Sequence, residues 1–282
     1  MLQENLIKIY EASFRDNREM PALTDYFKEE TFSYYEMAKE IAKLHLLFKK
    51  AGIKQGDKIA LIGRNNPRWC ITYLATITYG AVIVPILQDF TPADIIHIIN
   101  HSESRMLFLG DNFWDNIEED QIRQIEAVFS LTDFHVVYER DGKALTKFQR
   151  DILKNYRSKY PRGFSINDIK YPEIPNDQVI LLNYTSGTTG YSKGVMLTVN
   201  NLTSNVCSPQ RQSTPRPDSG TSRKEAARCR SCRWRTPTAA RSTSSRRWPS
   251  ADTSPCWVRF PRPKSCWKPW RWSGRRSSAA CR

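Results

Sequence analysis

The chain has 282 residues, of which 40% are hydrophobic and 26% charged, and its formal net charge is +14. A chain of this length can hold one large or two ordinary domains. The longest apolar run, at residues 79–87, is far shorter than the ~20 residues of a membrane-spanning helix. Charged residues (Glu4, Lys8 and Glu11) interrupt the N-terminus where a signal peptide would be apolar. We therefore expect a cytoplasmic protein without a transmembrane segment.

The basic character of the chain is confined to its last 76 residues. Residues 1–206 contain 24 Lys and Arg against 26 Asp and Glu, whereas residues 207–282 contain 19 against 3. The second segment also holds six of the seven Cys and six of the eight Trp, and it lacks Leu, Ile and Met. Such a composition cannot build an ordinary core. We predict one folded domain over residues 1–206 and an unstructured basic tail over residues 207–282.

Two helices are predicted early in the folded part. Ser33 and Glu36 have the spacing of a capping box. An apolar stripe at helical intervals follows them: Met37, Ile41, Leu44 and Phe48. Gly52 then supplies a C-cap. Asn66 and Pro67 open the second helix, because proline suits the first helical turn, and this helix extends to about residue 77.

Short apolar segments bounded by turn residues alternate with helical stretches along the rest of the domain. The strands are expected at residues 58–63, 81–86, 106–109, 135–138 and 179–183. The helices between them are expected near residues 92–101, 115–130 and 145–159. Alternating strands and helices favour a parallel sheet with helices on both faces, so the predicted fold class is α/β.

The most informative segment is residues 184–194 (YTSGTTGYSKG), which follows the last predicted strand. Glycines let backbone N–H groups approach an anion, hydroxyl groups donate to its oxygens, and lysine adds a positive charge. That combination suits a polyphosphate. For a loop of this composition alone, a solvent-exposed turn is the more frequent explanation. The segment is not a P-loop (G-x-x-x-x-G-K-S/T), because Gly187 is followed five positions later by Ser192 instead of glycine.

Other conspicuous side chains are interpreted as structural. Cys70 lies in an apolar helix, where a buried and unreactive thiol is expected. Four aromatic residues are interpreted as core or helix-packing residues: Trp69, Trp114, Tyr34 and Tyr35. The four histidines lack the spacing of metal ligands, so no metal site is predicted: His45, His97, His101 and His135. The acidic residues 118–120 are interpreted as a solvated helix face.

Residues 185–194 resemble the phosphate-binding signature S/T-S-G-S/T-T-G-x-P-K-G of adenylate-forming (AMP-binding) enzymes, which include acyl-CoA synthetases, luciferases and peptide-synthetase adenylation domains. Nine of the ten positions match, and Ser192 replaces the proline. Four further segments that resemble the family precede the loop in the family's order: 56–60 (GDKIA), 66–69 (NPRW), 80–85 (GAVIVP) and 100–103 (NHSE). The resemblance covers residues 5–206, about a third to two-fifths of a full-length member. It implies a partial N-terminal domain of the adenylate-forming fold.

The resemblance implies that a fatty acid is activated with ATP and Mg²⁺ and then transferred to coenzyme A. The expected partners are therefore small molecules; no specific nucleic acid is expected, and peripheral membrane association stays open. The resemblance also implies three kinds of contact to the phosphates. Hydroxyl groups donate from Thr185, Ser186, Thr188 and Thr189, the backbone approaches closely at Gly187 and Gly190, and Lys193 supplies the positive charge. The family's catalytic and metal-binding residues would lie beyond residue 206. No such residue is assigned, and this chain alone is expected to be inactive.

The basic tail has three interpretations. Cys229 and Cys232 form one close pair, without the second pair that a zinc site needs. The Arg and Trp content suits nucleic-acid binding, which is the alternative function of the chain. The third interpretation is a shift of reading frame near Val206. Residues 231–236, regrouped one base earlier, permit Phe-Leu-Pro-Leu-Ala-His, which resembles a block that acyl-CoA synthetases carry after the phosphate loop. We favour the third interpretation.

Overall fold

A computed structural model describes residues 4–25, 28–110, 113–140, 142–185 and 192–212. The chain beyond residue 212, which makes up most of the predicted tail, lies outside the described residues. The last described helix, α7 (Val199–Gln212), continues past the predicted domain boundary at residue 206.

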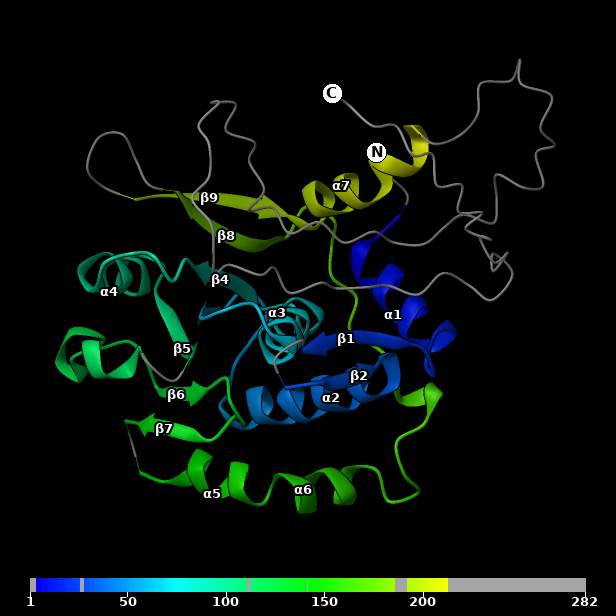
Figure 1. Ribbon diagram of the computed structural model, residues 1–282, viewed down its shortest axis with the longest axis horizontal. Helices are drawn as coiled ribbons and strands as arrows, with labels where there is room; N and C mark the ends of the chain where they lie inside the picture. The colour runs from blue at the N-terminus through cyan, green and yellow to red at the C-terminus, as the bar shows by residue number, and fades with distance from the viewer. Residues whose placement is uncertain (1–3, 26–27, 111–112, 141, 186–191, 213–282) are drawn as a thin grey trace, which may run out of the picture.

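The centre of the fold is a seven-stranded sheet with the order β7-β6-β5-β3-β4-β8-β9 (Figure 1). Five inner strands are mutually parallel: β3 (Lys58–Ile62), β4 (Val82–Ile86), β5 (Ser104–Leu109), β6 (Ala127–Ser130) and β8 (Val179–Thr185). An antiparallel strand closes each margin: β7 (Val136–Glu139) beside β6 and β9 (Lys193–Thr198) beside β8. This arrangement confirms the predicted α/β class.

Both faces of the sheet are buried. Successive strand residues point to opposite sides, and each side contributes to an apolar cluster. Ile59 and Leu61 of β3 belong to one apolar cluster, and Ala60 and Ile62 belong to another. Most of the helical residues in the first cluster come from α1 (Leu6–Asp16), α2 (Tyr34–Lys50) and α3 (Pro67–Tyr79). The second cluster is covered by α4 (Pro92–His101). The sheet is thus a middle layer between helices.

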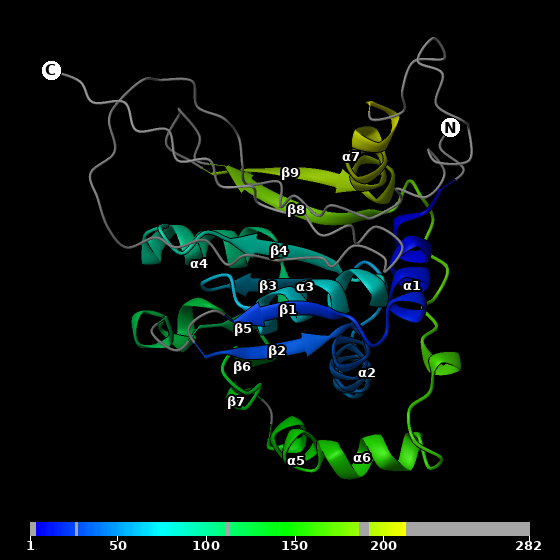
Figure 2. The same cartoon turned by 45° about the vertical axis from the view of Figure 1, so that its right-hand side comes forward.

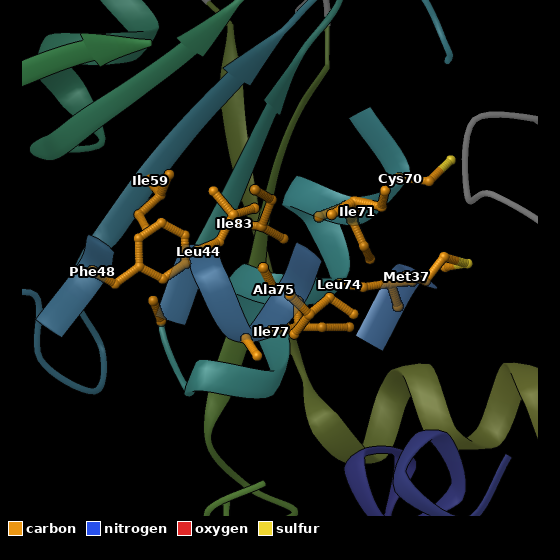
Figure 3. Packing of buried hydrophobic residues seen from close by; sticks show 14 of the residues in the cluster. Met37, Leu44, Phe48, Ile59, Cys70, Ile71, Leu74, Ala75, Ile77 and Ile83 are labelled. Atoms are coloured by element: carbon orange, nitrogen blue, oxygen red, sulfur yellow. The ribbon is translucent and has the colours of Figure 1, made fainter. Parts of the chain in front are cut away.

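Packing on the α2 side is dense. Leu44 and Phe48 of α2 lie beside Ile59 of β3 and Ile83 of β4 (Figure 3). The Phe48 ring meets Phe108 of β5 edge-on, with centroids 6.2 Å apart. Complete burial of one such side chain contributes about 1.5–3 kcal/mol to folding, so this cluster holds the sheet and its helices together.

The predicted helix caps are present. The Glu36 carboxylate accepts hydrogen bonds from the Ser33 N–H (2.8 Å) and hydroxyl (2.9 Å), which completes the capping box of α2. Asn66 caps α3 by accepting from the Trp69 N–H at 2.8 Å, with Pro67 in the first turn. At the end of α2 the C-cap itself is Ala51, and the predicted Gly52 follows in the left-handed conformation (φ +69°).

The predicted helix at residues 115–130 is wrong. This stretch contains two short 3₁₀ turns, Trp114–Asn116 and Glu119–Gln121, followed by β6. All four residues of β6 are buried, and the strand pairs with β5 on one side and β7 on the other. Tertiary pairing therefore overrides local helical propensity here. The acidic residues 118–120 are exposed as predicted, but they lie at the start of a 3₁₀ turn, with Glu118 directly before it, instead of on a helix face.

The remaining elements frame the sheet. The predicted helix at residues 145–159 is divided at Asp151 into α5 (Ala144–Arg150) and α6 (Ile152–Lys159). A hairpin of β1 (Pro21–Asp25) and β2 (Glu30–Ser33), which the sequence analysis did not predict, contacts α2 and α3 (Figure 2). A third 3₁₀ turn, Ile166–Asp168, lies between α6 and β8.

Candidate functional site

The carboxyl ends of the parallel strands lie at one edge of the sheet. β3 leads through α3 to β4, whereas β4 leads through α4 to β5 on the other side of β3. In α/β folds, this divergence at the carboxyl ends marks the usual ligand-binding position. β8 is parallel to β4, with Leu181 opposite Ile83. The predicted phosphate loop therefore starts at this edge, one strand from the divergence.

Two predicted phosphate contacts flank the loop at its base. Thr185 ends β8, Lys193 begins β9, and the two pair across the antiparallel ladder. Residues directly opposite in such a ladder share a face, with Cβ atoms about 4.5–5.5 Å apart. Both residues are exposed, and within the described part of the chain Lys193 forms no ion pair. A hydroxyl and an ammonium group are thus brought to the same face of the β8–β9 pair at the base of the loop.

The other predicted contacts occupy the loop itself. They lie outside the described residues: Ser186, Gly187, Thr188, Thr189 and Gly190. Ser192, which stands where the signature has proline, is described and half-buried.

The base of the loop also includes residues that the sequence analysis did not assign to the site. Tyr184, directly before Thr185, is 2% exposed, and its hydroxyl lies 2.7 Å from His101 Nδ1 at the end of α4. Burial raises the pKa of Tyr184, so the hydroxyl stays protonated. Gly194 faces Tyr184 across the ladder. His101 belongs to the 100–103 segment of the family resemblance, which was the signal available for it.

Two other segments that carry the resemblance form ion pairs at the ends of the strands: Asp57 precedes the amino end of β3, and Arg68 follows its carboxyl end. Asp57 and Glu126 both bind the guanidinium of Arg105, the second at 2.6 Å. Arg68, in the first turn of α3, pairs with Glu30 of β2 at 3.1 Å. Arg105 and Arg68 are both paired with carboxylates of the fold, so these groups position strands and helices.

Three of the residues interpreted as structural, Cys70, Trp69 and His45, pack within the fold. Cys70 is 8% exposed, and Trp69 stacks on Tyr73 with centroids 5.6 Å apart. His45 Nε2 lies 3.0 Å from the Ala75 carbonyl oxygen, and burial lowers the pKa of His45 to about 4. Across the described ranges, no three His, Cys, Asp or Glu residues are grouped as metal ligands would be.

Comparison with known proteins decides the family. A family model described as AMP-binding enzyme matches residues 10–223. The chain belongs to the AMP-binding enzyme family. The Thr185–Lys193 pair at the carboxyl edge of the sheet therefore lies within an AMP-binding domain.

Curated AMP-binding relatives match only part of their own length. A luciferin 4-monooxygenase of Photuris pensylvanica is 28% identical over 64% of this chain and 32% of its own. A long-chain-fatty-acid–CoA ligase of Escherichia coli O157:H7 is 24% identical over 72% and 38%. A crotonobetaine/carnitine–CoA ligase of Proteus mirabilis is 30% identical over 62% and 32%. The chain thus spans about a third of the length of these relatives.

Solved structures share the fold. A fatty acyl CoA synthetase of Mycobacterium tuberculosis aligns with a TM-score of 0.54 at 18% identity, over 74% of this chain and 37% of its own. A luciferase-like enzyme of the mealworm Zophobas morio aligns with a TM-score of 0.57 at 14% identity, over 72% of this chain and 45% of its own.

None of the helices in the described ranges is long and apolar enough to cross a membrane.

Proposed function

We propose that this AMP-binding domain comes from an acid–CoA ligase and that its share of the reaction is to bind the phosphates of ATP. The observation that carries the proposal is the placement of Thr185 and Lys193 side by side at the carboxyl edge of the sheet, on either side of a glycine- and hydroxyl-rich loop. The CoA ligases among the relatives support the reaction type.

In this proposal the loop binds the β- and γ-phosphates. Lys193 supplies the positive charge, and glycines let backbone N–H groups approach the oxygens. The hydroxyl groups come from four residues: Thr185, Ser186, Thr188 and Thr189. Close backbone approach comes from Gly187 and Gly190. These donors stabilise the charge that develops on the leaving pyrophosphate, so their effect grows toward the transition state.

The proposed reaction has two steps. A carboxylate oxygen of the acid attacks the α-phosphorus of ATP, the bond to the β-phosphate breaks, and acyl-adenylate and pyrophosphate form. The sulfur of coenzyme A, having lost its proton, then attacks the acyl carbon, and AMP leaves. The first step needs no general base because the acid is ionised near pH 7. Mg²⁺ would arrive with the nucleotide and neutralise phosphate charge; we assign it no ligand in this chain.

We propose a fatty acid as the substrate and the cytoplasm, where ATP and coenzyme A are available, as the location. The long-chain-fatty-acid–CoA ligases among the relatives support this choice. Other relatives are named for 4-hydroxybutyrate and for crotonobetaine or carnitine. The carboxylate is common to all of these acids. It is therefore the better supported part of the substrate assignment.

Binding of inorganic tripolyphosphate tests the phosphate site, because this probe needs no contact to adenine or ribose. Titration calorimetry of the 282-residue protein should give saturable binding, which Lys193→Ala weakens about five- to tenfold through loss of one charged contact. Lys264→Ala is the matched control, because it removes the same charge from the basic tail. Equal losses in the two variants would assign the binding to the tail and defeat the proposal.

Ligase activity is expected to be absent from the 282-residue polypeptide, because it spans only 32–38% of the length of the relatives cited above. Fatty-acid-dependent exchange of pyrophosphate into ATP measures the first step directly. Exchange well above that of Lys193→Ala would contradict this expectation.

We further propose that the sequence after residue 206 is read out of frame. Sixty-six of its 76 residues have codons with C or G in the middle position, as expected when third bases of a GC-rich gene are read as second bases. Nucleotide sequence across codons 200–240 tests this, and one intact frame in independent clones would refute it. The second candidate function, nucleic-acid binding by the tail, predicts binding that falls steeply with salt and is lost on deletion of residues 207–282.

A further inference from the structure

The start of the phosphate loop is tied to a helix that is 83 residues away in the sequence. Tyr184 occupies the penultimate position of β8, and its side chain lies in the apolar cluster covered by α4. There its hydroxyl meets Nδ1 of His101, the last residue of α4, at 2.7 Å. The two rings are almost perpendicular (88°), with centroids 5.8 Å apart. The contact therefore fixes both the position and the tilt of the tyrosine ring.

The strand that follows the loop holds the same ring from the other side. Gly194 is paired with Tyr184, and a Cβ atom at this glycine would lie 3.2 Å from the tyrosine Cζ and 3.2 Å from Leu182 Cδ1. The ring thus fills the space that a side chain at position 194 would need. The Tyr184 ring therefore connects the strand before the loop to Gly194 in the strand after it. The hydroxyl of this ring is bonded to His101 of α4.

We propose that His101 is a positioning residue for Thr185 and Lys193, the two proposed phosphate contacts that the structure describes. His101 holds the Tyr184 hydroxyl and thereby fixes the orientation of the end of β8, where Thr185 lies. Through the contact of Tyr184 with Gly194 it also fixes the start of β9, where Lys193 lies. The inference rests on the proposed function, since it concerns the geometry of the same phosphate site. His101 acts through Tyr184 and need not touch the ligand.

Removal of either partner should weaken tripolyphosphate binding without unfolding the protein. His101→Ala leaves a buried hydroxyl without its partner, and Tyr184→Phe removes that hydroxyl while keeping the ring. Each is expected to lower the affinity about three- to tenfold, because loss of one neutral hydrogen bond has effects of this order. If His101 and Tyr184 act through the hydrogen bond between them, the double variant should bind tripolyphosphate no more weakly than the single variant with the lower affinity.

A conservative variant separates positioning from general damage to the fold. In His101→Asn an amide atom occupies the place of Nδ1, so this variant should recover most of the lost affinity. Tyr35→Phe is the matched control: it also removes a tyrosine hydroxyl, one that donates to the Phe164 carbonyl in the other apolar cluster. It should bind tripolyphosphate like the wild type.

Hydrogen exchange without ligand provides a readout that does not depend on phosphate binding. Amides of Thr185, Lys193 and Gly194 should exchange at least threefold faster in His101→Ala and Tyr184→Phe than in the wild type or in Tyr35→Phe. Unchanged exchange together with unchanged affinity would overturn the positioning role and leave the proposed function intact. Faster exchange in a protein that never binds tripolyphosphate would support the positioning role and overturn the proposed function.

Discussion

β3 and β9 are short strands of one sheet, but they meet solvent in opposite ways. β3 has a parallel neighbour on each side, and four of its five residues are buried. β9 has only β8 beside it within the described structure, and Val195 and Met196 are 45% and 68% exposed. The comparison shows that the buried residues that stabilise the fold and the residues of the candidate site lie in different parts of the sheet. Helices cover the inner strands, whereas the site residues lie on the β8–β9 hairpin at the margin of the sheet.

This separation has a physical basis. A ligand site needs exposed polar groups, and those groups cost stability when they are buried without partners. At the margin, Thr185 and Lys193 stay solvated while Tyr184 anchors the hairpin to the core. Substitutions in the centre should therefore change folding, whereas substitutions at the margin should change binding with little effect on folding.

The largest expected effect is at the centre. Phe108 of β5 is fully buried and stacks on Phe129 with centroids 5.1 Å apart. Phe108→Ala should lower the free energy of unfolding by about 3–5 kcal/mol, through lost burial and the cavity left behind. Urea unfolding followed by circular dichroism measures this. A loss below about 1 kcal/mol would mean that the centre of the sheet is not where stability resides.

The second effect depends on pH. The pKa of His45 is lowered by burial to about 4, below the ~6.5 of an unfolded chain. The unfolded chain therefore takes up the proton first, and this contribution to stability is complete above pH 6.5 and declines toward pH 4. The unfolding free energy should fall by about 1–2 kcal/mol from pH 7 to pH 5.

His45→Gln serves as the control for this pH effect, because glutamine does not titrate and its amide can still donate to the Ala75 carbonyl. The part of the pH dependence that His45 causes is the difference between the two proteins. Identical unfolding curves for both at pH 5 and pH 7 would contradict the assignment.

A smaller effect is expected at the helix that covers the centre. Ser33→Ala removes the side-chain cap of α2 and should cost about 1 kcal/mol at pH 7. The backbone N–H and the hydroxyl of Ser33 both lower the pKa of Glu36, and the variant loses only the hydroxyl; the hydroxyl's share of this contribution is present above pH 4.5 and lost as the pH falls through the lowered pKa. The difference between wild type and variant, measured by urea unfolding, should therefore shrink at pH 3. A constant difference would show that the bond between the Ser33 hydroxyl and Glu36 contributes nothing to the cap.

The smallest effect on folding is expected at the margin. Met196→Lys on β9 should change the unfolding free energy by less than about 0.5 kcal/mol, since the side chain is largely in solvent. It should reduce concentration-dependent self-association, because a charge on an exposed edge strand opposes pairing with another chain. Light scattering over a tenfold concentration range compares the variant with the wild type. A destabilisation comparable to that of Phe108→Ala would remove the distinction between centre and margin.

The sequence by itself determined the features that depend on neighbouring residues. The capping box at Ser33, the Asn66–Pro67 helix start and the alternation of strands with helices are local patterns, and each is present in the structure. The order of residues 184–194 likewise predicted a phosphate loop, and the family match covers these residues.

Only the tertiary structure decided the features that depend on distant residues. Residues 127–130 form a strand because β5 and β7 pair with them, although the local pattern favoured a helix. Neither the pairing of Thr185 with Lys193 nor the bond between His101 and Tyr184 can be derived from spacing along the chain. A residue's chemistry can be identified from sequence, but its partner is set by the order of the strands, which follows from how both faces of the sheet are buried together.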